Sequence, residues 1–256
     1  MPTSKPIGSA ILRFDNVAST NATATDLLRR GEIENGAVII AKNQRGGKGQ
    51  RGNSWSSKEG KNLLCSIVLK PSGLKAINQF LLSAVAALAI QYTLAKLMGD
   101  VNSPATSKVK WPNDVLINGK KIAGILIENS VQGDEVSSSI IGIGMNVNQT
   151  SFDGLQHASS LFNFTNSELE IEHVLELLIA NMNAFHRLIW LDPILLIELF
   201  KDHLYARHTW VDLEVNGQKD EFRILGIEGD GRLKIEDRAF STSSVHNHEV
   251  RWLDFQ

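Results

Sequence analysis

The sequence has one cysteine among 256 residues and no excess of either charge. Cys65 has no partner for an intramolecular disulfide, which excludes a disulfide-stapled secreted scaffold and favours a reducing compartment. With 26 Lys plus Arg against 28 Asp plus Glu, the formal charge of -2 lacks the basic excess of a protein that coats nucleic acid. Neither a CxxC nor an HExxH pattern indicates a zinc site. We therefore expect an ordinary globular protein in the cytoplasm.

Long hydrophobic runs are also missing. The best candidate for a membrane span, Phe80–Ile90, has 11 residues and is interrupted by Ser83, whereas a spanning helix needs about 20. The first ten residues contain no apolar stretch of signal-peptide length. We therefore expect a buried core helix at Ala76–Met98 and no membrane association.

Short apolar runs alternate with helical patterns along the first 200 residues. Runs rich in Val and Ile are typical of buried strands, and Asp192 followed by Pro193 is a helix-start signal. Strands are predicted at Ala10–Phe14, Ala37–Ala41, Leu63–Leu69, Val109–Trp111, Val115–Ile117, Ile122–Glu128 and Ser139–Gly144, and helices at 19–28, Ala76–Met98, Leu169–Trp190 and Pro193–Tyr205. This mixture, with hairpin signals such as Asn118-Gly119, favours an α+β fold over a regular βαβ series.

The pattern changes near Arg207. From Thr209 onward the chain shows only short alternating runs, broken by Asn216-Gly217 and Asp230-Gly231. These features are typical of a small antiparallel barrel or meander. We predict a first domain at residues 1–206 and a β domain at 207–256.

The segment Lys42–Lys61 is polar and rich in glycine. It holds six Lys or Arg, one Glu and five Gly, a local charge of about +5 in a nearly neutral protein. Glycine lets the backbone approach an anion closely, and the cations neutralise phosphate oxygens. The segment matches neither a P-loop nor a strand-bound GxGxxG. From composition alone, an anion-binding loop and a solvated basic loop both remain open.

Two further segments could carry chemistry. In Lys110–Asp114 (KWPND), Asn113 and Asp114 can turn the chain and offer oxygens to a Mg²⁺ ion or a ribose, although a simple turn explains the pattern as well. Lys121 opens an apolar run in which alternation aims one of Lys120 and Lys121 inward, unless both are solvated. The glycines of Gly142–Asn148 (GIGMNVN) allow a ligand to approach a strand end, as would a β-bulge.

Together these segments resemble the biotin–protein ligase family. Its signatures occur in order: STN at Ser19–Asn21, a GRGRRGxxW-type loop at Gly47–Trp55, KWPND with KIAGIL at Lys110–Leu126, and GIGxNVN at Gly142–Asn148. The similarity is strong over residues 12–128, good over 140–148 and looser in the C-terminal part. It implies a class II synthetase-like catalytic domain, a mixed sheet with flanking helices, followed by a small SH3-like β-barrel.

The resemblance also implies a reaction and a set of residues. Biotin and MgATP form biotinyl-5′-adenylate, and a lysine of a biotin carboxyl carrier protein domain of a biotin-dependent carboxylase then takes the biotinyl group. Lys121, Arg51 and Lys48 are the implied catalytic residues. The implied biotin contacts are Ser19, Thr20, Asn21, Gln44, Lys48, Gly49, Gln50 and Lys121, and the implied nucleotide contacts are Gly47, Arg51, Trp55, Asn113, Asp114 and Asn146, with Asp114 a possible Mg²⁺ ligand.

This sequence departs from the family pattern in the loop, where Lys48 and Gln50 replace arginines. Because glutamine makes no charge-assisted contact with phosphate, we expect looser retention of the adenylate. Fewer than a dozen residues precede the first predicted strand, too few for a helix-turn-helix module, so we expect a ligase without DNA binding. The family implies a possible homodimer. Trp111 and Cys65 are expected to be core-packing residues.

Three alternatives stay open. A lipoate or octanoate ligase shares the catalytic fold, but its arginine- and glycine-rich motif with a histidine-containing segment is missing here. A catalytically silent biotin sensor would be expected to lose Lys121 or the glycine-rich loop, and both are present. An RNA-binding module usually pairs basic residues with several exposed aromatics, whereas this loop has only Trp55.

Overall fold

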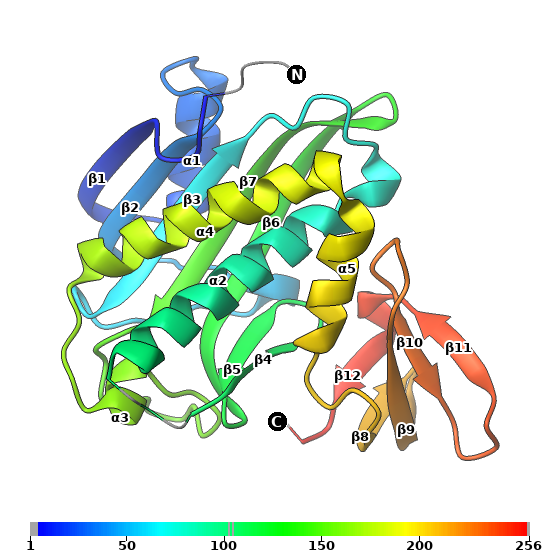
Figure 1. Cartoon of the computed structure of the whole chain (residues 1–256). Helices are drawn as coiled ribbons and strands as arrows, with labels where there is room; N and C mark the ends of the chain where they lie inside the picture. The colour runs from blue at the N-terminus through cyan, green and yellow to red at the C-terminus, as the bar shows by residue number, and fades with distance from the viewer. Residues whose placement is uncertain (1–4, 102, 104, 255–256) are drawn as a thin grey trace.

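The computed structural model describes residues 5–101, 103 and 105–254, which form two β-sheets and a layer of helices (Figure 1). The larger sheet has the strand order β1-β2-β3-β7-β6-β5-β4. Only β1 and β2 pair in parallel, and the other neighbours are antiparallel. Its strands are β1 (Ala10–Val17), β2 (Ala37–Gln44), β3 (Asn62–Leu69), β4 (Ser107–Lys110), β5 (Asp114–Ile117), β6 (Lys120–Gln132) and β7 (Glu135–Asn146). The predicted mixed sheet is confirmed.

Helices α2 and α4 lie side by side across one face of this sheet, with α5 next to them (Figure 1). The helices are α1 (Thr20–Arg29), α2 (Phe80–Asp100), α3 (Leu161–Thr165), α4 (Ile171–Leu191) and α5 (Pro193–Asp202). The segment Ala76–Asp100, which includes α2, is long and apolar enough to cross a membrane, but 78% of its most apolar window is buried inside the protein. Its packing is that of the predicted core helix.

The alternation of β7 assigns its two faces different roles. Ile141, Ile143 and Met145 belong to the main core under α2 and α4. Ile140 packs instead in a smaller cluster with Ala24 of α1. Side chains two residues apart share a face, so Gly142 and Gly144 continue the α1 face beyond the end of that cluster. Next to the start of α1, β7 therefore presents no side chain on this face at residues 142 and 144.

The second sheet is antiparallel, with the order β11-β10-β9-β8-β12. Its strands are β8 (Trp210–Val215), β9 (Gln218–Ile227), β10 (Leu233–Glu236), β11 (Thr242–Val245) and β12 (Val250–Trp252), and the short helix η3 (Asn247–Glu249) precedes β12. A second antiparallel sheet was predicted here. Its closure into an SH3-like barrel and a domain boundary at residue 207 stay predictions.

Trp111 joins the two sheets. Its side chain is 2% exposed, and its indole Nε1 donates to the carbonyl oxygen of Gly231 at 2.9 Å. The indole Nε1 of Trp252 donates in turn to the carbonyl oxygen of Trp111 at 3.0 Å. The expectation that Trp111 packs in the core is confirmed. Cys65 is fully buried, and burial raises the pKa of its thiol to about 12, as fits a packing residue.

Local departures from the predicted elements have simple causes. Residues Ala76–Asn78 form the short 3-10 helix η2, so the long helix begins at Phe80. The side chain of Asp192 accepts from the backbone N–H of Leu195 at 2.9 Å, which confirms the predicted N-cap of α5. Helix α3 was not predicted because five residues are too few to show a helical period.

Candidate active site

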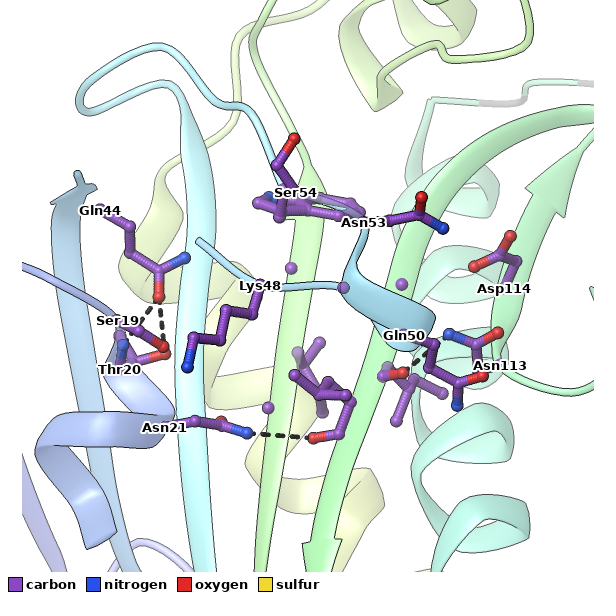
Figure 2. Close-up of a pocket in the computed structure, with 18 of the residues that line it drawn as sticks. Ser19, Thr20, Asn21, Gln44, Lys48, Gln50, Asn53, Ser54, Asn113 and Asp114 are labelled. Carbon is purple, nitrogen blue, oxygen red and sulfur yellow. Dashed lines mark hydrogen bonds between the residues drawn. The ribbon is translucent and has the colours of Figure 1, made fainter. Parts of the chain in front are cut away.

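One pocket lies on the α1 face of the sheet, over Gly142 and Gly144 and at the start of α1 (Figure 2). Ser19, Thr20 and Asn21 are each no more than 5% exposed, because they begin the helix against β2 and β3. Gln44 Oε1 accepts from the backbone N–H of Thr20 at 2.7 Å and from its hydroxyl at 3.1 Å. Four predicted biotin contacts thus form one end of the pocket, which carries hydroxyl and amide groups.

This polar end is held by two residues that the sequence did not single out. Ser66 Oγ of β3 lies 2.8 Å from Thr20 Oγ1 and 2.6 Å from Asn21 Oδ1. Asn21 Nδ2 donates to Glu128 Oε2 at 2.6 Å. The amide of Asn21 is therefore fixed in orientation before any ligand binds. The only sequence signals were a serine inside the apolar run LLCSIVL and an acid at the end of IAGILIE.

Glycines form the floor of the pocket. Gly124 of β6 and Gly144 of β7 are paired residues, and the indole ring of Trp55 lies on them. A Cβ atom at Gly144 would approach Trp55 Cζ2 to 2.7 Å and Nε1 to 2.8 Å. A Cβ atom at Gly142 would overlap Asn21 Oδ1. The glycines of the GIGMNVN segment are therefore required by close approach of side chains to the strand.

The glycine-rich loop forms the roof. The backbone N–H of Trp55 donates to Gly47 O at 2.9 Å and that of Gly49 donates to Asn53 O at 2.7 Å, so the loop folds back on itself. Its tip is the short helix η1 (Gln50–Gly52). Figure 2 shows the side chain of Lys48 pointing from the loop into the pocket, toward the start of α1. A loop cation therefore reaches the cavity at Lys48, one of the positions that the family resemblance implied.

Charged groups gather at the other end of the pocket. Lys121 Nζ lies 2.7 Å from Asp114 Oδ1, and Lys110 Nζ lies 3.9 Å from Asp114 Oδ2. Lys121 Nζ also lies 5.5 Å from the centre of the Trp55 ring. Burial lowers the pKa of Lys110, an effect that Asp114 opposes. Of the pair Lys120 and Lys121, it is Lys121 that faces the site.

A second cavity, of about 620 Å³, adjoins this charged end. Asp114, Lys121 and Trp55 line both cavities, and Lys110 and Asn146 line the second. Asn146 Nδ2 donates to Ser159 O at 3.0 Å, while its Oδ1 is buried with no hydrogen-bond partner. A cavity lined by an unpaired buried acceptor and two lysines suits a ligand that carries both N–H donors and negative charge.

Arg51, a predicted catalytic residue, lines neither of these two cavities. Its backbone has a φ of 56°, and its guanidinium points away from the pocket to the turn before β12. There Nη2 donates to Asn247 Oδ1 at 2.6 Å and Nη1 donates to Val250 O at 3.0 Å. Gly47 packs under Trp55 and does not line either cavity among the described residues. A phosphate contact by Arg51 is not formed in this arrangement and stays a prediction.

The described residues do not form a magnesium site by themselves. They contain no group of three His, Cys, Asp or Glu side chains placed to hold a metal ion. Asp114 is a single carboxylate, and it is already paired with Lys121. Magnesium usually binds through one or two carboxylates together with substrate phosphates. A Mg²⁺ role for Asp114 would therefore require the phosphates of a bound nucleotide, and it stays a prediction.

These features agree with the comparison to known proteins. The model of the Biotin/lipoate A/B protein ligase family matches residues 14–146, which is more than half of the chain. The chain belongs to that family. Within it, the chain is 38% identical over 148 residues to the bifunctional ligase/repressor BirA of Bacillus spizizenii, a match that spans 57% of this chain and 43% of that relative.

A second relative is the biotin–[acetyl-CoA-carboxylase] ligase of Paracoccus denitrificans, 41% identical over 129 residues, or 50% of this chain and 51% of that protein. The chain thus spans about half the length of these relatives. Among solved structures, the biotin protein ligase from Aquifex aeolicus in complex with biotin and ATP has a TM-score of 0.78 at 22% identity. The similarity covers 94% of this chain and 97% of that one, and it confirms the shared fold.

Proposed function

We propose that this protein joins biotin to ATP as biotinyl-5′-AMP and transfers the biotinyl group to a lysine of a biotin carboxyl carrier protein. One observation carries the proposal above all. A pocket end built from fixed hydroxyl and amide groups lies opposite a lysine that borders a second cavity. Biotin has a polar ureido ring at one end and a carboxylate at the other, and it fits that polarity. The family match and the named relatives support the same assignment.

The polar end is suited to the ureido ring. A ureido group has two N–H donors and one carbonyl acceptor, and Thr20, Asn21 and Gln44 offer both kinds of partner. Because Ser66 and Glu128 already orient Asn21, little ordering is required when a ligand arrives. The Trp55 ring and the glycine floor form the apolar surface along which the aliphatic chain would lie.

The charged end is suited to adenylation. A carboxylate and a triphosphate repel each other, so cations must hold them in line. In the first step a carboxylate oxygen attacks the α-phosphorus, the bond to the β-phosphate breaks, and pyrophosphate leaves. Lys121 and Lys48 are the groups proposed to offset the charge that develops. Asp114 holds the Lys121 ammonium at the boundary between the two cavities.

The second step requires no cationic side chain beyond those proposed for the first. An uncharged lysine amine of the carrier attacks the acyl carbon, the bond from that carbon to the AMP oxygen breaks, and AMP leaves with the electron pair. The attacking nitrogen releases one proton to solvent water as the amide forms. We assign the nucleotide to the 620 Å³ cavity, where Asn146 Oδ1 has an open acceptor position.

The polarity of the pocket also distinguishes biotin from its rivals. A lipoyl or octanoyl group ends in an apolar dithiolane ring or alkyl chain, which has no donor or acceptor to offer the hydroxyl and amide groups near Thr20. A silent biotin sensor would share the polar end but would not require the paired Lys121. We favour the ligase because the pocket has both the polar end at Thr20 and the charged end at Lys121.

One experiment tests the assignment. The protein is incubated with MgATP, a carrier domain, and either labelled biotin or labelled lipoate, with the Lys121→Ala variant as a control. We expect ATP-dependent labelling with biotin, and labelling about 10²- to 10³-fold slower with the variant. Labelling with lipoate alone would identify a lipoate ligase, and biotin binding without labelling would identify a sensor. Gel filtration with light scattering tests the proposed homodimer separately.

A further inference from the structure

The tip of the glycine-rich loop is attached to the second sheet. Arg51 donates through Nε and Nη2 to Asn247 Oδ1, at 3.1 Å and 2.6 Å, and through Nη1 to Val250 O at 3.0 Å. Asn247 Nδ2 donates to Gln50 Oε1 at 3.2 Å. Within residues 5–101, 103 and 105–254, these are the hydrogen bonds that join the tip Gln50–Gly52 to residues outside the loop.

Apart from its tip, the loop segment Gly47–Trp55 is bonded mainly to itself. The amides of Gly49, Asn53 and Trp55 donate to carbonyls within residues 47–53. The loop is therefore closed on itself by a few short-range hydrogen bonds, which we expect to open more often when its tip loses the outside contact. Arg51 adopts a φ of 56°, a conformation that is unfavourable for a residue with a side chain. The three hydrogen bonds of its guanidinium offset that cost.

Asn247 is well placed to provide this contact. It lies in η3, one residue from His246 and three from the buried Val250. The N–H of Asn216 donates to Glu249 O at 2.9 Å, and β12 pairs with β8, so the turn is fixed to the second sheet. One side chain therefore meets two loop residues, accepting from one and donating to the other.

We propose that Asn247 is a positioning residue that holds the glycine-rich loop over the pocket through Arg51 and Gln50, and so slows the escape of the bound adenylate. The second part rests on the proposed function. In this assignment Arg51 acts by fixing the loop, while Lys48 is the loop cation that faces the cavity. The contact joins residues 196 positions apart in the chain.

The first measurement is hydrogen–deuterium exchange of the amides of Gly49, Asn53 and Trp55 in the full-length protein without ligand. We expect Asn247→Ala to speed their exchange about tenfold, since hydrogen bonds to a charged partner are each worth roughly a factor of ten or more. Asn247→Asp retains acceptor oxygens for the guanidinium and should restore slow exchange. Arg51→Ala should reproduce the Asn247→Ala result by removing the other partner.

Two controls match these variants. His248→Ala alters an exposed residue of the same turn, and Arg251→Ala removes one exposed arginine from β12. Both should leave exchange of the three amides unchanged. If Asn247→Ala exchanges like the wild type, or like His248→Ala, the positioning role is refuted.

The second measurement is the half-life of biotinyl-AMP on the protein, which Asn247→Ala should shorten about tenfold while Asn247→Asp does not. Faster loop exchange with an unchanged half-life would refute the link between the loop contact and retention. A wild type that forms no adenylate would refute the proposed function instead, and the exchange result would still decide the contact, because it requires no ligand.

Discussion

The glycine floor offers the sharpest single prediction. Gly144→Ala places a methyl group on the pocket face of β7, 2.7 Å from Trp55 Cζ2 and 2.8 Å from Nε1. Ordinary carbon contacts begin near 3.4 Å, so the indole must rise from the sheet by roughly 1 Å. Overpacking of this size costs about 1–3 kcal/mol, which corresponds to a rise of about 5- to 150-fold in Kd for biotin.

The free energy of unfolding should change much less than the affinity. Trp55 belongs to a self-closed loop and can move away, so the ligand-free protein relieves the clash without repacking the core. We therefore expect a melting temperature close to that of the wild type without biotin, and a smaller rise on adding biotin.

Calorimetric titration of biotin together with thermal unfolding is the appropriate assay. Gly99→Ala is the matched control, because it lies in α2 with no atom within 4 Å of the place that its added methyl group would occupy. The control should bind biotin like the wild type. If Gly144→Ala also binds within twofold of the wild type, the glycine floor does not shape the pocket and the reasoning fails.

Three further predictions concern other parts of the molecule. Lys121→Ala should lower the rate of adenylate formation about 10²- to 10³-fold, as measured by pyrophosphate release, because it removes the charge that Asp114 holds at the cavity boundary. Gln50→Arg should slow release of free biotinyl-AMP, because a charge-assisted contact with the phosphate outweighs the single neutral hydrogen bond from Asn247 that the change removes, and equal release from both proteins would contradict this. Burial lowers the pKa of His186 from 6.5, so the unfolded chain binds more protons below that pH and stability falls as the solution is acidified. His186→Leu should therefore lose less stability than the wild type between pH 8 and pH 5 in thermal melts.

Local sequence patterns predicted the elements of the fold but only part of their arrangement. The runs at residues 37–41 and 63–69 are so apolar that buried strands were the natural interpretation, and both strands are present. Local patterns did not predict the order of the strands in the sheet. β3 pairs with β7, 70 or more residues further along the chain, and no local signal encodes that partnership.

The sequence likewise predicted some residues of the candidate site and missed others. Thr20, Gln44 and Lys121 are distant in sequence, yet the structure brings them to one pocket as the motifs implied. Ser66 was missed because a single hydroxyl in an apolar run gives no sign of its partner. The direction of Arg51 was missed for a related reason: its acceptor, Asn247, belongs to a turn whose position depends on the whole second sheet.

The contacts of Trp111 between the two sheets affect how the protein unfolds. Its indole is hydrogen-bonded to Gly231, its carbonyl accepts from Trp252, and one continuous hydrophobic cluster includes both Trp111 and the second sheet. Separating the sheets would expose a large buried ring to water and replace two protein hydrogen bonds by hydrogen bonds to water. The two sheets should therefore melt in a single cooperative transition, and a chain cut near Arg207 should yield fragments that are only partly folded alone.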